Sequence, residues 1–152
     1  MAKALEICSL DNSASVVISV IDTETQHVPS VGVSVTLRGD FAGSNPHVWY
    51  EQAALLGFVR GLKKVEARRD GQAALDSMSP GECVFCVRCV GLRGFILVQV
   101  RLSRIVHFHD AGQSENNQLI VTFEMDREMF HHLIADFGEL AAQVKDDPFG
   151  QE

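Results

Sequence analysis

Residues 82–102 read ECVFCVRCVGLRGFILVQVRL, and the predicted fold is built around this segment. Two runs rich in β-branched and aromatic residues flank a short segment bounded by two glycines, and this pattern predicts a β-hairpin. The polar residues Arg88, Gln99 and Arg101 interrupt the apolar runs without alternating regularly with them. Such strands are typical of the middle of a sheet that is covered on at least one face. We expect two amphipathic helices to supply that cover.

The two helices are predicted from apolar residues at helical spacing. The first should run from Pro46 to Arg69, with Asn45 as its N-cap and Trp49 near its start. Two glycines in it, Gly57 and Gly61, mark a close approach to a strand. The second should be capped by Asp126 and run to about Lys145, where residues 146–150 stop it. Its apolar stripe consists of Met129, Phe130, Leu133, Ile134, Phe137, Leu140 and Ala141.

The other strands are predicted from runs of alternating or β-branched residues. In the N-terminal part of the chain they cover residues 4–10, 14–22 and 31–38, and they form an antiparallel meander. After the hairpin, whose second strand continues through residues 105–109, a polar loop at 110–117 precedes the last strand at 119–124. Residues 72–78 fit either an extra strand or a turn.

Together these elements predict a single α+β domain over residues 1–152. It contains one antiparallel sheet of about six strands, in two meanders of three, with two helices packed on one face. A chain of 152 residues, 46% of them hydrophobic and 22% charged, suits one domain with one core. The longest apolar runs fall short of the roughly 20 residues that a membrane helix needs. No signal peptide is visible at the N-terminus, so we expect a cytoplasmic protein.

The charges are unevenly distributed along the chain, and their sum is −7. Residues 58–104 hold nine Lys and Arg against four Asp and Glu, whereas the segments before and after them are acidic. The net acidity disfavours binding to nucleic acid, which requires clusters of Lys and Arg, and it suits a basic protein partner. The basic residues of the first helix are interpreted as a solvated helix face.

Three closely spaced cysteines, Cys83, Cys86 and Cys89, look like a metal or redox motif but lie on a predicted strand. Side chains on a strand alternate between faces, so Cys83 and Cys86 point to opposite sides and cannot chelate one ion. A zinc site also needs a tight turn and a second pair of ligands. We therefore interpret these cysteines as small buried side chains, and we expect no cofactor.

One pair of histidines is a candidate metal site. On a strand, His107 and His109 would face the same side, about 6.5–7 Å apart, and Asp110 or His131 could complete the site. The competing interpretation is two surface histidines at a fraying strand end, since no third ligand has a recognisable spacing. No nucleophile elbow, phosphate-binding loop or dinucleotide fingerprint is present, so the sequence predicts no enzyme.

Acidic loop residues and one aromatic residue form the candidate partner-binding site. The acids lie in three predicted loops, where they would steer a basic partner, and Trp49 is either a core anchor or an exposed contact. The candidate residues are Asp22, Glu24, Asp40, Trp49, Asp110 and Glu115.

Residues 48–141 also follow a recognisable order of features. A helix that carries aromatic residues is followed by ALDSMSPGE at residues 74–82, then by a hairpin with Gly94 at its centre. A strand that ends in FEMD at 123–126 precedes a helix rich in Leu and Phe. This order resembles small bacterial proteins related to the immunity protein of the Wap cell-wall toxin. Family members usually carry a Trp where this chain has Arg68 and Arg69.

The resemblance implies a non-enzymatic protein that binds and blocks a toxin domain, often a nuclease. Our leading hypothesis is therefore an immunity-type inhibitor that occludes a basic, nuclease-like toxin domain. The second hypothesis is a small ligand-binding or metal-binding module, or an enzyme, that uses His107 and His109. The third is an oligomerisation module, a homodimer with the polar face of residues 32–38 at its interface.

Overall fold

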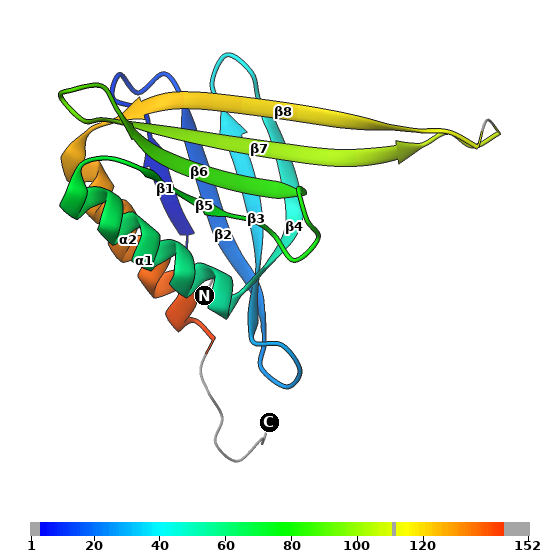
Figure 1. The fold of residues 1–152 in the computed structure, drawn as a ribbon. Coiled ribbons are helices and arrows are strands. Elements are labelled where there is room, and N and C mark those ends of the chain that lie inside the picture. Colours follow the sequence, from blue (N-terminus) through cyan, green and yellow to red (C-terminus); the bar gives the residue numbers. More distant parts are fainter. Residues whose placement is uncertain (1–3, 111, 145–152) are drawn as a thin grey trace.

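In the computed structural model, residues 4–110 and 112–144 are described, and four strands followed by a helix occur twice (Figure 1). Lys145 and residues 146–150, where the last helix was expected to stop, lie outside the described residues. The first unit consists of β1 (Ala4–Cys8), β2 (Ser15–Glu24), β3 (Ser30–Arg38), β4 (Gly43–Glu51) and α1 (Gln52–Arg68). The second consists of β5 (Gln72–Leu75), β6 (Cys83–Val90), β7 (Phe95–His107), β8 (Ser114–Met125) and α2 (Arg127–Ala142).

Over residues 4–110 and 112–144, the strands form two four-stranded antiparallel sheets rather than one sheet of about six strands. Within each sheet the spatial order of the strands is their order in the chain. The α+β class is confirmed, but the prediction of a single sheet is wrong. Helix α1 separates β4 from β5 in the chain, and the two strands belong to different sheets.

The two sheets cross, and the two helices lie together along one side of them (Figure 1). Helix α1 contacts β5 and β6 of the second sheet, while α2 contacts α1 and β1 of the first sheet. The helices therefore pack against both sheets, not on one face of a single sheet. Burial alternates along the strands, and the buried side chains include Val33 and Val48 of the first sheet and Val98 and Val100 of the second.

An aromatic cluster connects the helices to both sheets. Phe137 of α2 packs edge-on against Phe58 of α1 and Phe85 of β6, with ring centroids 5.0 and 5.6 Å away. Tyr50 of β4 lies 6.4 Å from Phe85. All four side chains are at most 2% exposed. Aromatic pairs in these orientations add to the free energy gained by burial, so this cluster is the centre of the core.

The expected first helix begins six residues later than predicted, at Gln52, and Asn45 with Pro46 does not cap it. Residues 43–51 form β4 instead, because Val48 and Tyr50 are buried while His47 and Glu51 are exposed. This alternation fits pairing with β3, and tertiary pairing outweighs the local helix-start signal. Pro46 lies next to a register shift between β3 and β4, in an edge strand that tolerates proline.

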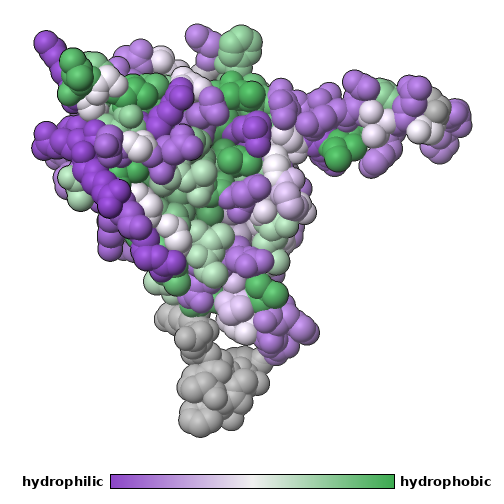
Figure 2. All heavy atoms as spheres, in the orientation of Figure 1, coloured by the Kyte–Doolittle hydropathy of each residue, from purple (hydrophilic) through white to green (hydrophobic). Residues whose placement is uncertain are grey.

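The central hairpin is confirmed, and its second strand continues far beyond the first. Cys83 pairs with Leu102, but β7 runs on to His107, and β8 pairs with it along this whole length. The expected loop at 110–117 is therefore wrong from Ser114 onward. The extended part, residues 103–110 and 112–118, is called the arm here; it projects from the body and carries a mostly hydrophilic surface (Figures 1 and 2).

Local signals predicted several other features correctly. Residues 72–75 form the extra strand that was one of two interpretations for residues 72–78. Asp126 caps α2, since its side chain accepts hydrogen bonds from the backbone of Glu128 and Met129. A Cβ at Gly61 would lie 3.0 Å from Cβ of Ala73 on β5, so this glycine does mark a close approach, whereas Gly57 does not contact a strand.

Candidate partner-binding site around Trp49

Trp49 lies on the outer face of the first sheet, not at a helix start. Its indole ring covers Gly32 of the neighbouring strand β3, where a Cβ would come within 3.0 Å of the ring. The ring is half-buried, since one side rests on this glycine and the remainder lines an open hollow. Any larger residue at position 32 would displace the indole, so Gly32 fixes its orientation.

The hollow beside Trp49, called the Trp49 pocket below, has a volume of about 300 Å³. Its wall is mostly apolar, with the indole and Met78 among its lining residues, and two glutamates also line it. The residues that line it are Glu24, Ser30, Trp49, Met78, Ser79 and Glu82.

The segment between β5 and β6 completes the pocket and is fastened to β4 by two hydrogen bonds. The backbone amide of Met78 donates to the carbonyl oxygen of Trp49 at 2.8 Å. The buried hydroxyl of Tyr50 donates to the carbonyl oxygen of Cys83 at 2.9 Å. These bonds join the two sheets, and they hold Met78 and Glu82 beside the indole.

Two side chains give this connecting segment its shape. Asp76 accepts hydrogen bonds from the backbone amides of Ser77 and Gly81 at 2.8 Å each. The buried Ser77 hydroxyl donates to the carbonyl of Ser79 at 2.7 Å and accepts from the amide of Cys83. Because the turn is satisfied internally, the position of Glu82 is set before any partner binds.

Two acidic residues of β2 share the outer face of the first sheet with Trp49. Asp22, Gly32 and Trp49 lie in one row across β2, β3 and β4, and Glu24 lies opposite Ser30 in the next row. The Glu24 carboxylate accepts a 2.6 Å hydrogen bond from the amide of Gln26, and this bond lowers the pKa of Glu24. Together with Glu82, these acids give the pocket a negative field at neutral pH.

A second, larger hollow adjoins the first and shares Glu82 with it. It has a volume of about 520 Å³ and lies between the start of β4 and the base of the arm. Its wall is rich in amide and hydroxyl groups, including Asn45, Asn117 and Gln118. His47, which lines it, lies with its ring centroid 5.4 Å from that of Trp49. The two hollows are therefore lined by neighbouring rings, the first by Trp49 and the second by His47.

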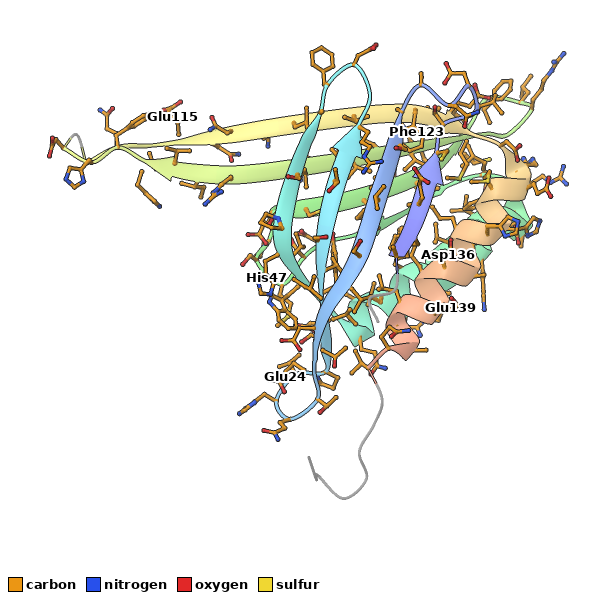
Figure 3. The ribbon with its side chains drawn as sticks, turned by 180° about the vertical axis from the view of Figure 1, so that it is seen from behind. Glu24, His47, Glu115, Phe123, Asp136 and Glu139 are labelled. Carbon is orange, nitrogen blue, oxygen red and sulfur yellow. The ribbon has the colours of Figure 1, made fainter. Side chains whose placement is uncertain are left out.

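The structure brings only part of the predicted site together. Asp22, Glu24 and Trp49 share the outer face of the first sheet, whereas Asp40 lies in the exposed β3–β4 connection at the other end of that sheet. Asp110 and Glu115 lie at the tip of the arm, and Figure 3 shows Glu115 far from Glu24 and His47. The predicted acids therefore form no single patch.

Sequence reasoning missed Met78, Glu82 and His47 as members of this site. Met78 was assigned to the strand or turn at residues 72–78, Glu82 to the start of the hairpin segment, and His47 was not named as a binding residue. One signal was present, because Gly32 lies inside the predicted strand at residues 31–38, and a glycine inside a strand often marks the close approach of another group. The identity of that neighbour depends on the register of β3 with β4.

The histidine pair is not supported by its surroundings. His107 ends β7 and His109 lies in the exposed turn that follows, so the strand geometry expected for the pair does not reach His109. Across residues 4–110 and 112–144, no three His, Cys, Asp or Glu side chains lie close enough together to hold a metal ion.

The cysteines are free thiols in the described structure, and of the three that were interpreted as small buried side chains only Cys83 is fully buried. Cys83 is buried, while Cys86 and Cys89 are half-buried. Burial raises the pKa of Cys83 to about 12, so this thiol stays protonated at neutral pH and is a poor nucleophile.

The residues around Trp49 offer an aromatic face, carboxylates and hydrogen-bonding groups. This set of groups suits recognition of a cation.

Comparisons with protein-family models, with curated proteins and with solved structures found no match for this chain. The resemblance of residues 48–141 to the Wap immunity proteins therefore stays a prediction. Neither helix of the described chain is long and apolar enough to cross a bilayer.

Proposed function

We propose that the protein is a non-enzymatic binding protein that takes a basic side chain of a protein partner into the Trp49 pocket. The observation that carries the proposal is the indole of Trp49, which rests on Gly32 in a pocket that Glu24 and Glu82 also line. A guanidinium or ammonium group over an indole gains about 0.5–1 kcal/mol at an exposed site. A hydrogen bond to a charged group adds roughly 1.5–3 kcal/mol.

Arginine fits this pocket better than lysine does. Its planar guanidinium stacks on an aromatic ring and still presents several N–H donors at its edge. Glu24 and Glu82 line the pocket, and their carboxylates can accept those hydrogen bonds. Met78 adds apolar surface for the methylene groups of the same side chain.

Within this class, we propose an immunity-type inhibitor that occludes a basic, nuclease-like toxin domain in the cytoplasm. Its support is the net charge of −7, the two glutamates that line the Trp49 pocket, and the resemblance of residues 48–141 to such proteins. A nuclease binds phosphate with Arg and Lys, and an acidic protein that covers those residues blocks the substrate.

Fluorescence of Trp49 tests the cation site directly, because this residue is the only tryptophan in the chain. We expect a short arginine peptide to change the emission in a saturable way, while the same peptide with citrulline in place of arginine leaves it unchanged. Glu82→Gln should weaken binding about tenfold, since one charged hydrogen bond is lost. Glu115→Gln at the arm tip is the matched control. Equal responses to both peptides would remove the basis for the site.

Capture from the lysate of the native organism tests the inhibitor proposal separately. With the wild-type chain as bait, we expect one stoichiometric basic protein that carries a toxin domain, identified by mass spectrometry. Trp49→Ala should lose most of this protein, because central aromatic contacts often contribute 2 kcal/mol or more, roughly a 30-fold change in affinity. A captured protein without a toxin domain would refute the inhibitor role but leave the cation site intact.

A further inference from the structure

The edge of the second sheet offers a different kind of interaction surface. Each four-stranded sheet has two outer strands, which are β1 and β4 in the first sheet and β5 and β8 in the second. An outer strand carries a row of backbone N–H and C=O groups that can pair with another chain. Proteins commonly block such edges with short strands, charges, prolines or bulges.

Three of the four edges are blocked in these ways. Strand β1 has five residues and contains Glu6, and β5 has only four residues. Strand β4 contains Pro46 beside a register shift. None of these strands offers a long regular row of backbone groups.

Strand β8 has none of these protections over most of its length. It spans 12 residues and pairs with β7 without a register shift. Its segment NNQLIVTF, residues 116–123, contains no charged residue, no proline and no glycine. Ile120 at the middle of this segment is 49% exposed. A long, regular and uncharged edge strand with exposed apolar side chains is a site of strand pairing.

Two hydrogen bonds show which backbone groups of β8 point away from β7. The carbonyl of Glu124 accepts a bond from the amide of Leu10, which lies in the β1–β2 turn. On β7, the backbone amide of Ser103 donates to the carbonyl oxygen of Glu82. This bond points away from β8, where Gln118 is the cross-strand partner of Ser103. Because bonded and non-bonded pairs alternate in antiparallel strands, residues 118, 120, 122 and 124 present their amides and carbonyls outward.

We infer that β8 pairs with β8 of a second copy of this chain, antiparallel, about a two-fold axis at Ile120. This register places Ile120 opposite its own copy and Gln118 opposite Thr122 twice. All three residues present outward-facing backbone groups, so about six backbone hydrogen bonds form. The bond from Leu10 already occupies the carbonyl of Glu124, and it ends the pairing there.

The side chains of this register complement one another, which favours a second copy over an unrelated strand. A two-fold axis brings each residue against a partner from the same segment, so the side chains of the segment must be compatible with those of its own copy. Here the two isoleucines make an apolar contact, Gln118 and Thr122 can exchange hydrogen bonds, and no like charges face each other. The inference rests on β8 alone and does not depend on the Trp49 pocket or on the polar face of residues 32–38.

Light scattering coupled to gel filtration tests the pairing on the full chain. We expect the wild-type mass to be twice 16.7 kDa at high concentration. Ile120→Lys should return it to 16.7 kDa, because it sets two ammonium groups against each other at the axis. Ile105→Lys is the matched control: Ile105 is 60% exposed on the arm, but it lies on β7, and this variant should stay dimeric.

A second variant distinguishes loss of pairing at the β8 edge from loss of the folded structure. Gln118→Pro removes only an amide that points away from β7, so the β7–β8 pairs remain and the dimer should be lost. Circular dichroism should match the wild type for all three variants. A wild-type chain that is monomeric at every concentration, or an Ile120→Lys variant that remains dimeric, would overturn the inference.

Discussion

Phe137→Ala is expected to lower the free energy of unfolding by about 3–5 kcal/mol. The Phe137 ring is 0% exposed and contacts Phe58 and Phe85 edge-on, so its removal leaves a cavity where a helix meets the second sheet. Small domains are stable by only about 5–15 kcal/mol, so this loss is a large share of the total. Urea unfolding followed by circular dichroism measures it.

Phe41→Ala is the matched control for this experiment. Phe41 is 72% exposed in the β3–β4 connection, and the same substitution removes the same atoms without opening a cavity. Its effect should stay within about 0.5 kcal/mol of zero. If the two variants unfold at the same urea concentration, the aromatic cluster is not the centre of the core.

The central hairpin could be predicted because its sequence is consistent at every level. Its apolar runs, its glycines and the break before it all indicate two paired strands. Burial alternates along both strands, so the register leaves Cys83 inside and Arg88 outside. The stripe of the last helix was predictable for the same reason, since Phe130, Leu133 and Phe137 face the core at helical spacing.

Strand β4 could not be predicted, because its local signals favour a helix. Asn45 and Pro46 fit a cap and a first helical turn, and no single residue in 43–51 contradicts that interpretation. The neighbouring strand β3 decides the conformation, because Val48 and Tyr50 pair with it in the fold. Propensity is a weak signal when tertiary pairing competes with it.

The polar half of β8 was missed for a related reason. Residues 114–118 read as a loop because they are polar, but in the arm both faces of the strand are exposed and no apolar face is needed. The number of sheets depended on strand order, which the sequence does not encode locally. Two sheets follow from the assignment of residues 43–51 and 72–75 to strands on opposite sides of α1.

The Trp49 site shows the same division between local and tertiary information. Composition and loop position identified Trp49, Asp22 and Glu24 as candidates. The contact between Trp49 and Gly32, and the approach of Glu82, depend on strand register and on hydrogen bonds between the sheets. The same acids that sequence reasoning grouped together are divided by the fold between the Trp49 surface, the β3–β4 connection and the arm tip.

That division provides a matched pair of charge reversals. Asp22→Lys with Glu24→Lys changes the surface beside Trp49, and Asp110→Lys with Glu115→Lys changes the arm tip. Both double variants shift the formal net charge by the same amount, so any difference between them comes from where the charges lie. We expect the first pair to weaken binding of the arginine peptide at least about tenfold, as the local field changes sign.

The arm-tip pair should change the affinity by no more than about twofold, because exposed charges beyond a Debye length are largely screened. Fluorescence of Trp49 measures both variants, since neither replaces the reporter residue. Added salt should weaken peptide binding to the wild type and to the arm-tip variant, and have little effect on the Asp22 and Glu24 variant. Equal losses in both variants would mean that net charge, rather than the carboxylates around the indole, attracts the peptide.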